Sequence, residues 1–122
     1  MNAIVHEYNP YLQGSYAPVN AQIDAPLQLL AGAIPADLQG IYVRNGPNPH
    51  SPPEGRHHWF DGDGMLHAVA FANGQATYCN RWVETAGLQL ERSTGKAQWQ
   101  GIREPVRKMT LGRPYKDTAN TD

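Results

Sequence analysis

The clearest hydrophobic pattern lies in the second half of the chain, where two strand-like runs flank a turn. Met65–Phe71 and Gln75–Val83 are rich in β-branched, aromatic and small apolar residues, and Asn73-Gly74 lies between them. Both central residues of a type I′ turn need a positive φ, which asparagine and glycine tolerate. Apolar residues fall on both faces of the first run, as in a strand packed inside a multi-sheet body. The pattern predicts a β-hairpin.

Two shorter strands are predicted before the hairpin. Gly40–Arg44 is β-branched and aromatic, and it stops at Asn45–Pro49, a run of turn formers. His57–Phe60 is expected to be a short strand that ends at Asp61–Gly64. In this second turn we expect the glycines to adopt positive φ and the aspartates to accept hydrogen bonds from nearby backbone N–H groups.

One helix and one long arm complete the predicted elements. Thr85–Ser93 is expected to be a short helix with Thr85 as N-cap and Gly95 as its closing residue. Residues 1–26 are polar and rich in turn formers, which indicates an extended arm lying over something larger. The apolar Ala25–Ala33 fits either a short strand or a single helical turn.

These elements make a thin domain. Residues 96–122 show little periodicity and end without an apolar element. A stable β domain needs three or more strands and a covered hydrophobic face. Three or four short strands and one helix therefore indicate a piece of a larger fold, whose sheet edges expect partners.

The composition excludes several classes of protein. The 122 residues include ten Lys and Arg and eleven Asp and Glu, for a formal net charge of −1, without the basic patch typical of nucleic-acid binding. Cys79 is the single cysteine, so no internal disulfide can form. We see no signal peptide and no run of the roughly 20 apolar residues that a membrane helix needs. The expected location is cytoplasmic.

Three sequence blocks form a pattern that resembles a known family: Gly40–Pro49 (GIYVRNGPNP), His58–His67 (HWFDGDGMLH) and Gly74–Thr85 (GQATYCNRWVET). They resemble the carotenoid cleavage oxygenase family, which includes carotenoid-, apocarotenoid- and lignostilbene-cleaving members. Further blocks fit as well: Asn9–Val19 (NPYLQGSYAPV), Ile34–Gly40 (IPADLQG), Glu91–Gly95 (ERSTG) and Lys116–Thr121 (KDTANT). Several blocks in order are far more specific than any one of them, and the resemblance runs from about residue 9 to the end.

The resemblance implies an all-β fold, a seven-bladed β-propeller with short helical and loop segments and a helical cap over one face. Residues 1–122 would be the N-terminal part of a single carotenoid oxygenase domain, incomplete in this chain. Residues 1–26 would be the extended arm. Residues 27–122 would supply the first propeller strands, the hairpin and the start of the cap.

The resemblance also implies chemistry. Family members hold a non-haem Fe(II) through four histidines, braced by glutamates, and use O₂ to cut a conjugated double bond into two carbonyl products. The four iron-ligating histidines are expected beyond Asp122, so no catalytic residue and no metal ligand is predicted here. The chain alone is expected to bind no cofactor and to be inactive.

The substrate remains open at this stage. Asn9–Val19 favours a carotenoid or apocarotenoid, and a lignostilbene-type molecule is the alternative. A non-catalytic propeller remnant that binds an apolar ligand or a partner is a second class of function. The full-length protein could also touch a membrane peripherally through the cap.

Phe60 is the one residue expected near the substrate. The family's FDGDG block lies close to the axial cavity, and aromatic walls suit an apolar polyene. A plain core role is the alternative for Phe60. Arg44 and Asn45 are expected to orient a loop through backbone hydrogen bonds, and Tyr78 and Trp82 to pack within the blade.

Five polar side chains invite a metal site: His57, His58, His67, Asp61 and Asp63. Adjacent residues of a strand point to opposite faces, so at most one of His57 and His58 could join His67. We therefore favour structural roles, in which His58 packs and hydrogen-bonds near the sheet edge and His67 lies on a strand.

Other sites fail on their sequence patterns. An EF-hand calcium loop starting at Asp61 would have Met65 and Ala72 at positions that need oxygen ligands, so this template fails and a tight turn is the expected role. Cys79 has no neighbouring base in the sequence and is not expected to be a nucleophile. Ser51 and Ser93 lack the nucleophile-elbow motif.

Overall fold

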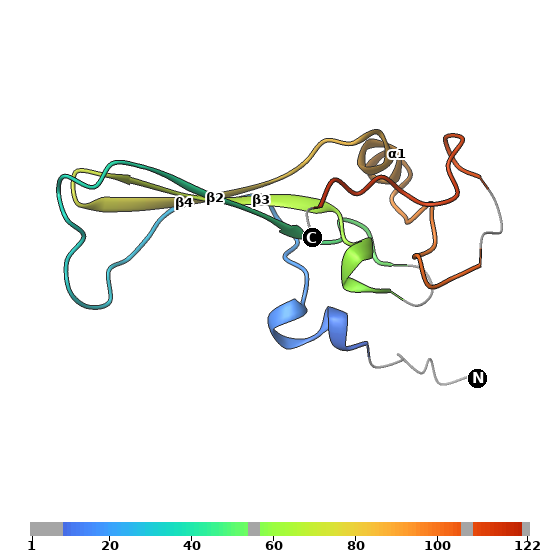
Figure 1. Cartoon of the computed structure of the whole chain (residues 1–122), viewed down its shortest axis with the longest axis horizontal. Coiled ribbons are helices and arrows are strands. Elements are labelled where there is room, and N and C mark those ends of the chain that lie inside the picture. The colour runs from blue at the N-terminus through green and yellow to red at the C-terminus, as the bar shows by residue number, and fades with distance from the viewer. Residues whose placement is uncertain (1–8, 54–56, 106–108, 121–122) are drawn as a thin grey trace.

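The computed structural model describes residues 9–53, 57–105 and 109–120. It is built on a four-stranded antiparallel sheet of β1 (Asp24–Pro26), β2 (Gly40–Pro47), β3 (Gly64–Ala72) and β4 (Gln75–Trp82). The strand order is β1-β4-β3-β2 (Figure 1). Strands β2 to β4 form a meander, and β1 pairs with the outer edge of β4.

The predicted hairpin is confirmed as β3 and β4. Ala72 pairs with Gln75, which leaves a two-residue turn between the strands. Asn73 has a φ of 54° and Gly74 a φ of 76°. Both values are positive, as a type I′ turn requires, and this turn has the twist that antiparallel strands need.

Strand β2 is longer than predicted. The turn expected at Asn45–Pro49 is wrong for its first three residues, since Asn45, Gly46 and Pro47 pair with β3. Proline is tolerated here because Pro47 ends an edge strand and has no ladder N–H to supply. Pairing along the whole of β3 therefore overrides the local turn signal.

The N-terminal arm ends in a strand of the sheet. Ile23 N–H donates to Asn80 Oδ1 at 2.6 Å, and Asp24 pairs with Arg81 at 2.7 Å, which ties β1 to β4. Only Ala25 and Pro26 of the run Ala25–Ala33 are in β1, and residues 27–33 form neither a strand nor a helical turn.

Two short 3-10 turns, η1 (Pro10–Leu12) and η2 (Gly14–Tyr16), interrupt the arm that was predicted to be extended. Asn9 caps η1, since its side chain accepts a hydrogen bond from the N–H of Tyr11 at 2.9 Å. Residues 1–8 of the predicted arm lie outside the described residues.

The predicted helix is confirmed as α1 (Ala86–Thr94). Thr85 Oγ1 accepts from the N–H of Leu88 at 3.0 Å, and Gly95 closes the helix with a φ of 77°. Leu88 is fully buried against Met65 and Trp82, which form the apolar core. The helix thus covers one end of the sheet (Figure 1).

After α1 the chain has little regular structure, as predicted. An isolated bridge joins Thr110 and Arg113, and the described tail then returns to the start of β3. Among the described residues, the regular structure is mostly sheet, with one α-helix. Within the described ranges, every helix is too short or too polar to traverse a lipid bilayer.

Candidate functional site

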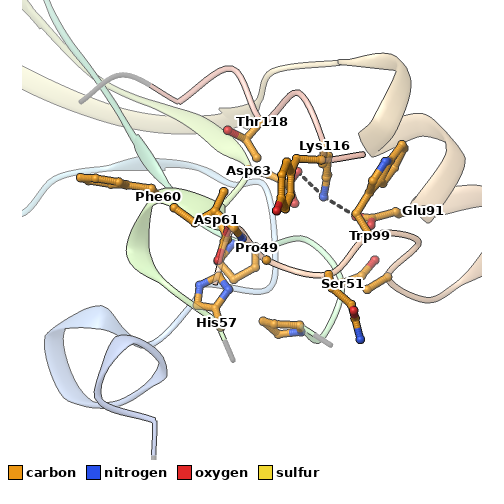
Figure 2. Close-up of a pocket in the computed structure, with 16 residues that line it drawn as sticks. Pro49, Ser51, His57, Phe60, Asp61, Asp63, Glu91, Trp99, Lys116 and Thr118 are labelled. Carbon is orange, nitrogen blue, oxygen red and sulfur yellow. Dashed lines mark hydrogen bonds and ion pairs between the residues drawn. The ribbon is translucent and has the colours of Figure 1, made fainter. Parts of the chain in front are cut away.

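The candidate site is a junction of three segments at the covered end of the sheet (Figure 2). The segments are the end of β2, the turn between His58 and Gly64, and the tail Lys116–Asn120. A cavity of about 70 Å³ lies beside this junction, between the loop after β2, the turn before β3 and residues 97–102, and its lining includes His57, Asp63 and Trp99. A buried water needs about 10–15 Å³, so a space of this volume has room for a few waters.

The turn before β3 is a 3-10 helix, η3 (Trp59–Asp61), so the short strand predicted at His57–Phe60 is wrong. His58 caps η3: its Nδ1 accepts from the N–H of Phe60 at 3.1 Å, and its own N–H donates to Asp61 Oδ2 at 2.9 Å. These reciprocal bonds satisfy donors at the helix start that a strand would direct to a neighbouring strand.

The aspartates of this turn accept backbone hydrogen bonds, as predicted. Asp61 Oδ1 accepts from the N–H of Ile102, and Asp63 Oδ2 from the N–H of His50, both at 2.9 Å. The prediction of positive φ at the glycines is wrong, since neither Gly62 nor Gly64 has one.

Close approach explains the glycines instead. A Cβ on Gly62 would lie 2.7 Å from the Cβ of Pro47, and a Cβ on Gly64 would lie 2.5 Å from the carbonyl oxygen of Ala119. Separations below 3.0 Å are not tolerated by real Cβ atoms. The two glycines therefore let β2 and the tail pack directly on the turn.

A buried ion cluster closes the junction. The ammonium group of Lys116 pairs with Asp63 Oδ1 at 2.6 Å and also with Glu91 Oε1 of α1 (Figure 2). The side chains of Asp63 and Glu91 are each 2% exposed, and that of Lys116 is 11% exposed. Asp63 Oδ1 has no other donor among the described residues, so Lys116 is its partner. Removing Lys116 would leave two buried carboxylates without a cation.

The tail is tied to the turn by hydrogen bonds as well as by charge. Gly64 N–H donates to the carbonyl of Thr118 at 2.7 Å, and Asn45 Nδ2 donates to the carbonyl of Ala119 at 2.8 Å. Asn120 Nδ2 donates to the carbonyls of both Phe60 and Gly62. The blocks RNGPNP, FDGDG and KDTANT therefore bond to one another.

His57 lies at the edge of the same cavity and is buried. Burial lowers the pKa of its imidazole, while the nearby carboxylates of Asp61 and Asp63 partly oppose this effect. The imidazole is therefore neutral at pH 7. The cluster therefore consists of the carboxylates of Asp63 and Glu91 and the ammonium of Lys116, and His57 adds no positive charge to it.

The five side chains considered as a metal site do not come together. His58 caps η3, and its ring lies tilted against that of Tyr11 with the ring centroids 4.9 Å apart. On the sheet, by contrast, His67 Nδ1 forms a hydrogen bond with Tyr78 Oη at 2.6 Å. In the described parts of the chain, no three His, Cys, Asp or Glu side chains are arranged to hold a metal ion. The structural roles predicted for His58 and His67 hold.

Phe60 lies at the mouth of the cavity, with 47% of its surface exposed. Its ring meets that of His58 edge to face, with the ring centroids 4.7 Å apart. Both roles considered for Phe60, a substrate contact and a plain core residue, stay predictions.

The structure also places the other residues that the sequence analysis named. Asn45 bonds the tail backbone, as expected of a residue that orients a segment. Trp82 is buried, and its indole N–H donates to the carbonyl of Asn48 at 2.8 Å. Tyr78 and the half-buried thiol of Cys79 lie on β4, away from the junction.

Sequence reasoning did not identify Glu91 and Lys116 as partners of Asp63. One signal was present: Glu91 lies three residues after Leu88, on the apolar face of α1, where a carboxylate needs a partner. Nothing in the local pattern indicated that the partner would come from Lys116, 25 residues later.

Known proteins of the family that the sequence blocks resemble match most of the chain. The family model described as retinal pigment epithelial membrane protein matches residues 16–122. A probable carotenoid cleavage dioxygenase 4 of Arabidopsis thaliana is 45% identical over 85 residues, which cover 69% of this chain and 14% of the relative. A carotenoid cleavage oxygenase of Mycobacterium tuberculosis is 48% identical over 82 residues, 66% of this chain and 16% of the relative. The chain thus spans about a sixth of the length of these relatives.

Solved structures with the same local fold come from the same group of enzymes. Pseudomonas brassicacearum lignostilbene dioxygenase superposes with a TM-score of 0.74 at 28% identity, over 93% of this chain and 23% of that one. A variant of the Synechocystis apocarotenoid oxygenase gives a TM-score of 0.70 at 31% identity, over 85% and 23% of the two chains. The chain belongs to the carotenoid cleavage oxygenase family, whose matching family model is described as retinal pigment epithelial membrane protein.

Proposed function

We propose that the protein is part of an oxygenase that cleaves a conjugated carbon–carbon double bond of a carotenoid or apocarotenoid. In the overall reaction the C=C bond and the O–O bond of O₂ break, and two C=O bonds form. The observation that carries the proposal is the identity of 45–48% with relatives named for carotenoid cleavage.

A lignostilbene-type substrate is the second candidate. It is favoured by the TM-score of 0.74 to a lignostilbene dioxygenase, which covers 93% of the chain. Both candidates share a double bond conjugated to an apolar body, so the exposed ring of Phe60 would serve either one. We propose Phe60 as a residue that contacts this body.

The described residues do not themselves offer a site for iron. We propose that Fe(II) is held by four histidines beyond Asp122, and that the sheet described here is one blade of a seven-bladed propeller. Blades of propellers are four-stranded sheets, which is the size of the sheet formed by β1 to β4. When bound, the metal would supply the O₂ chemistry.

In this proposal the junction has a positioning role. It fixes the direction in which the chain leaves Asn120, through backbone and side-chain bonds to Asn45, Phe60 and Gly64.

The test is O₂ consumption by the full-length protein loaded with Fe(II), with an apocarotenal and a hydroxystilbene as alternative substrates. The proposal predicts that one O₂ is consumed per alkene cleaved and that two carbonyl products form. If neither substrate supports O₂ consumption, the oxygenase proposal is wrong and the non-catalytic alternative is favoured.

Phe60 is tested in the same assay. Phe60→Ala should raise KM for the cleaved substrate, whereas Phe60→Leu, which keeps an apolar side chain, should have a smaller effect. An unchanged KM in both variants would contradict the proposed contact.

A further inference from the structure

A second hollow, of about 190 Å³, lies on the sheet between the N-terminal arm and strands β2 and β3. Its floor includes Arg44 of β2 and His67 of β3, which are direct cross-strand partners. Its walls come from the arm and from Trp59 of η3. Segments far apart in the sequence thus build one hollow with both polar and aromatic lining residues.

Among the described residues, this hollow contains the positive charge of Arg44 and no negative charge. Arg44 carries a permanent positive charge, and no Asp or Glu is among the lining residues. None of the ion pairs formed between described residues includes Arg44. By contrast, Arg81 on the other face of the same sheet is paired with Asp24.

His67 is held in place beside Arg44. Its Nδ1 is 2.6 Å from Tyr78 Oη, which fixes the ring on the sheet. Burial, and then the charge of Arg44, lower the pKa of His67. The imidazole is therefore neutral at pH 7, and an anion placed beside it would favour its protonation.

The walls of the hollow are held by specific contacts. Asn48 accepts from the N–H of Val19 at 2.8 Å and donates to the carbonyl of Val19 at 3.0 Å, so the arm is fixed against the end of β2. The rings of Tyr16 and Trp59 meet edge to face with centroids 5.1 Å apart. These two aromatic rings give the hollow an apolar side next to its cationic floor.

We propose that this hollow binds a carboxylate carried on an aromatic or other apolar body, with Arg44 as the cation that recognises it. The planar guanidinium matches a carboxylate in two parallel hydrogen bonds. Tyr16 and Trp59 would contact the apolar body. The carboxylate could come from a small molecule or from an acidic side chain elsewhere in the protein, and the inference does not depend on the proposed oxygenase function.

The experiment uses benzoate as the probe and benzamide as its neutral control, with the full chain labelled in its histidine rings for NMR. Benzoate should raise the pKa of His67, and benzamide should not. Arg44→Gln should weaken benzoate binding about tenfold or more, since a hydrogen-bonded charge contributes about 1.5–3 kcal/mol. Arg81→Gln, on the opposite face, should leave benzoate binding unchanged.

The two sources of the carboxylate give different results. If an acidic side chain of the protein already occupies the hollow, benzoate will not bind, and the pKa of His67 will lie above its ordinary value until Arg44 and its partner are separated by salt. If benzoate has no effect and the pKa of His67 stays low, the proposal is wrong. Equal binding of benzoate and benzamide, or equal benzoate binding by Arg44→Gln, would overturn it too.

Discussion

The two ends of the sheet differ in what covers them. Next to α1, Met65 and Leu88 are fully buried and Trp82 is nearly so. At the opposite end, Ile41 and Tyr42 of β2 are 68% and 62% exposed. Figure 1 shows this end of the sheet projecting away from α1 and the tail. The strands pair along their full length, but the described residues enclose only one end.

The two ends of the sheet are stabilised in different ways. The covered end combines an apolar core with a buried ion cluster and backbone contacts, so its structure depends on residues within this chain. The open end exposes apolar side chains on β2, an edge strand that pairs only with β3 among the described residues. Exposed apolar residues at this end are consistent with our proposal that the sheet is one blade of a larger propeller.

The largest expected effect comes from breaking the ion cluster. Lys116→Met should lower the free energy of unfolding by about 3–5 kcal/mol, because Asp63 and Glu91 would remain buried without a cation. Urea unfolding followed by tryptophan fluorescence measures the change. Lys96→Met is the matched control: Lys96 is exposed, so a change within about 0.5 kcal/mol is expected. Similar losses in both variants would refute the role of the cluster.

The second effect compares the two ends directly through apolar truncations. Met65→Ala should cost about 2–5 kcal/mol, because the residue is fully buried between Trp82 and Leu88. Ile41→Ala at the open end should change stability by about 0.5 kcal/mol or less in this chain. Thermal unfolding of both variants checks the contrast, and comparable losses would mean that the open end is covered in solution.

The third effect tests the close approach of the tail to the turn. Gly64→Ala should destabilise by about 1–3 kcal/mol, because its Cβ would meet the carbonyl oxygen of Ala119 at 2.5 Å. Gly46→Ala is the control on the paired strand, since its Cβ would meet only the flexible end of Arg44 at 3.4 Å. The account is wrong here if urea midpoints show Gly64→Ala to be the milder change.

The smallest effect is a pH dependence that arises from His57. Its pKa is lowered in the folded protein, so below the ordinary value of 6.5 the unfolded state binds more protons. Stability should therefore fall as the pH drops from 6.5 to the lowered pKa of the folded state, and then level off with respect to this group. His57→Gln should flatten that part of the profile. A stability profile that is the same in both proteins would contradict the assignment.

The sequence predicted the elements whose signals are local. Asn73-Gly74 fixed the hairpin, and Thr85 and Gly95 marked both ends of α1, because turn and capping preferences act within a few residues. Residues His57–Phe60 were misread because aromatic content suggested a strand, whereas the capping bonds of His58 and Asp61 made a 3-10 turn.

The junction could not be predicted in the same way, because its contacts join distant segments. Lys116 pairs with Asp63, which lies 53 positions earlier in the sequence. Glycine is required at position 64 because the carbonyl oxygen of Ala119 lies against it. The resemblance to a family pointed to the right blocks but did not show that they bond to one another. Phe60 was nominated as a substrate contact on resemblance alone, and that role stays a prediction.

The account depends most on the tail being locked to the turn at the covered end of the sheet. The amide hydrogen exchange of Gly64 measures this directly, since its N–H donates to the carbonyl of Thr118 at 2.7 Å. We predict strong protection of this amide in the unmodified protein and a marked loss of protection in Lys116→Met. An unprotected Gly64 amide, or protection that Lys116→Met leaves unchanged, would contradict the account.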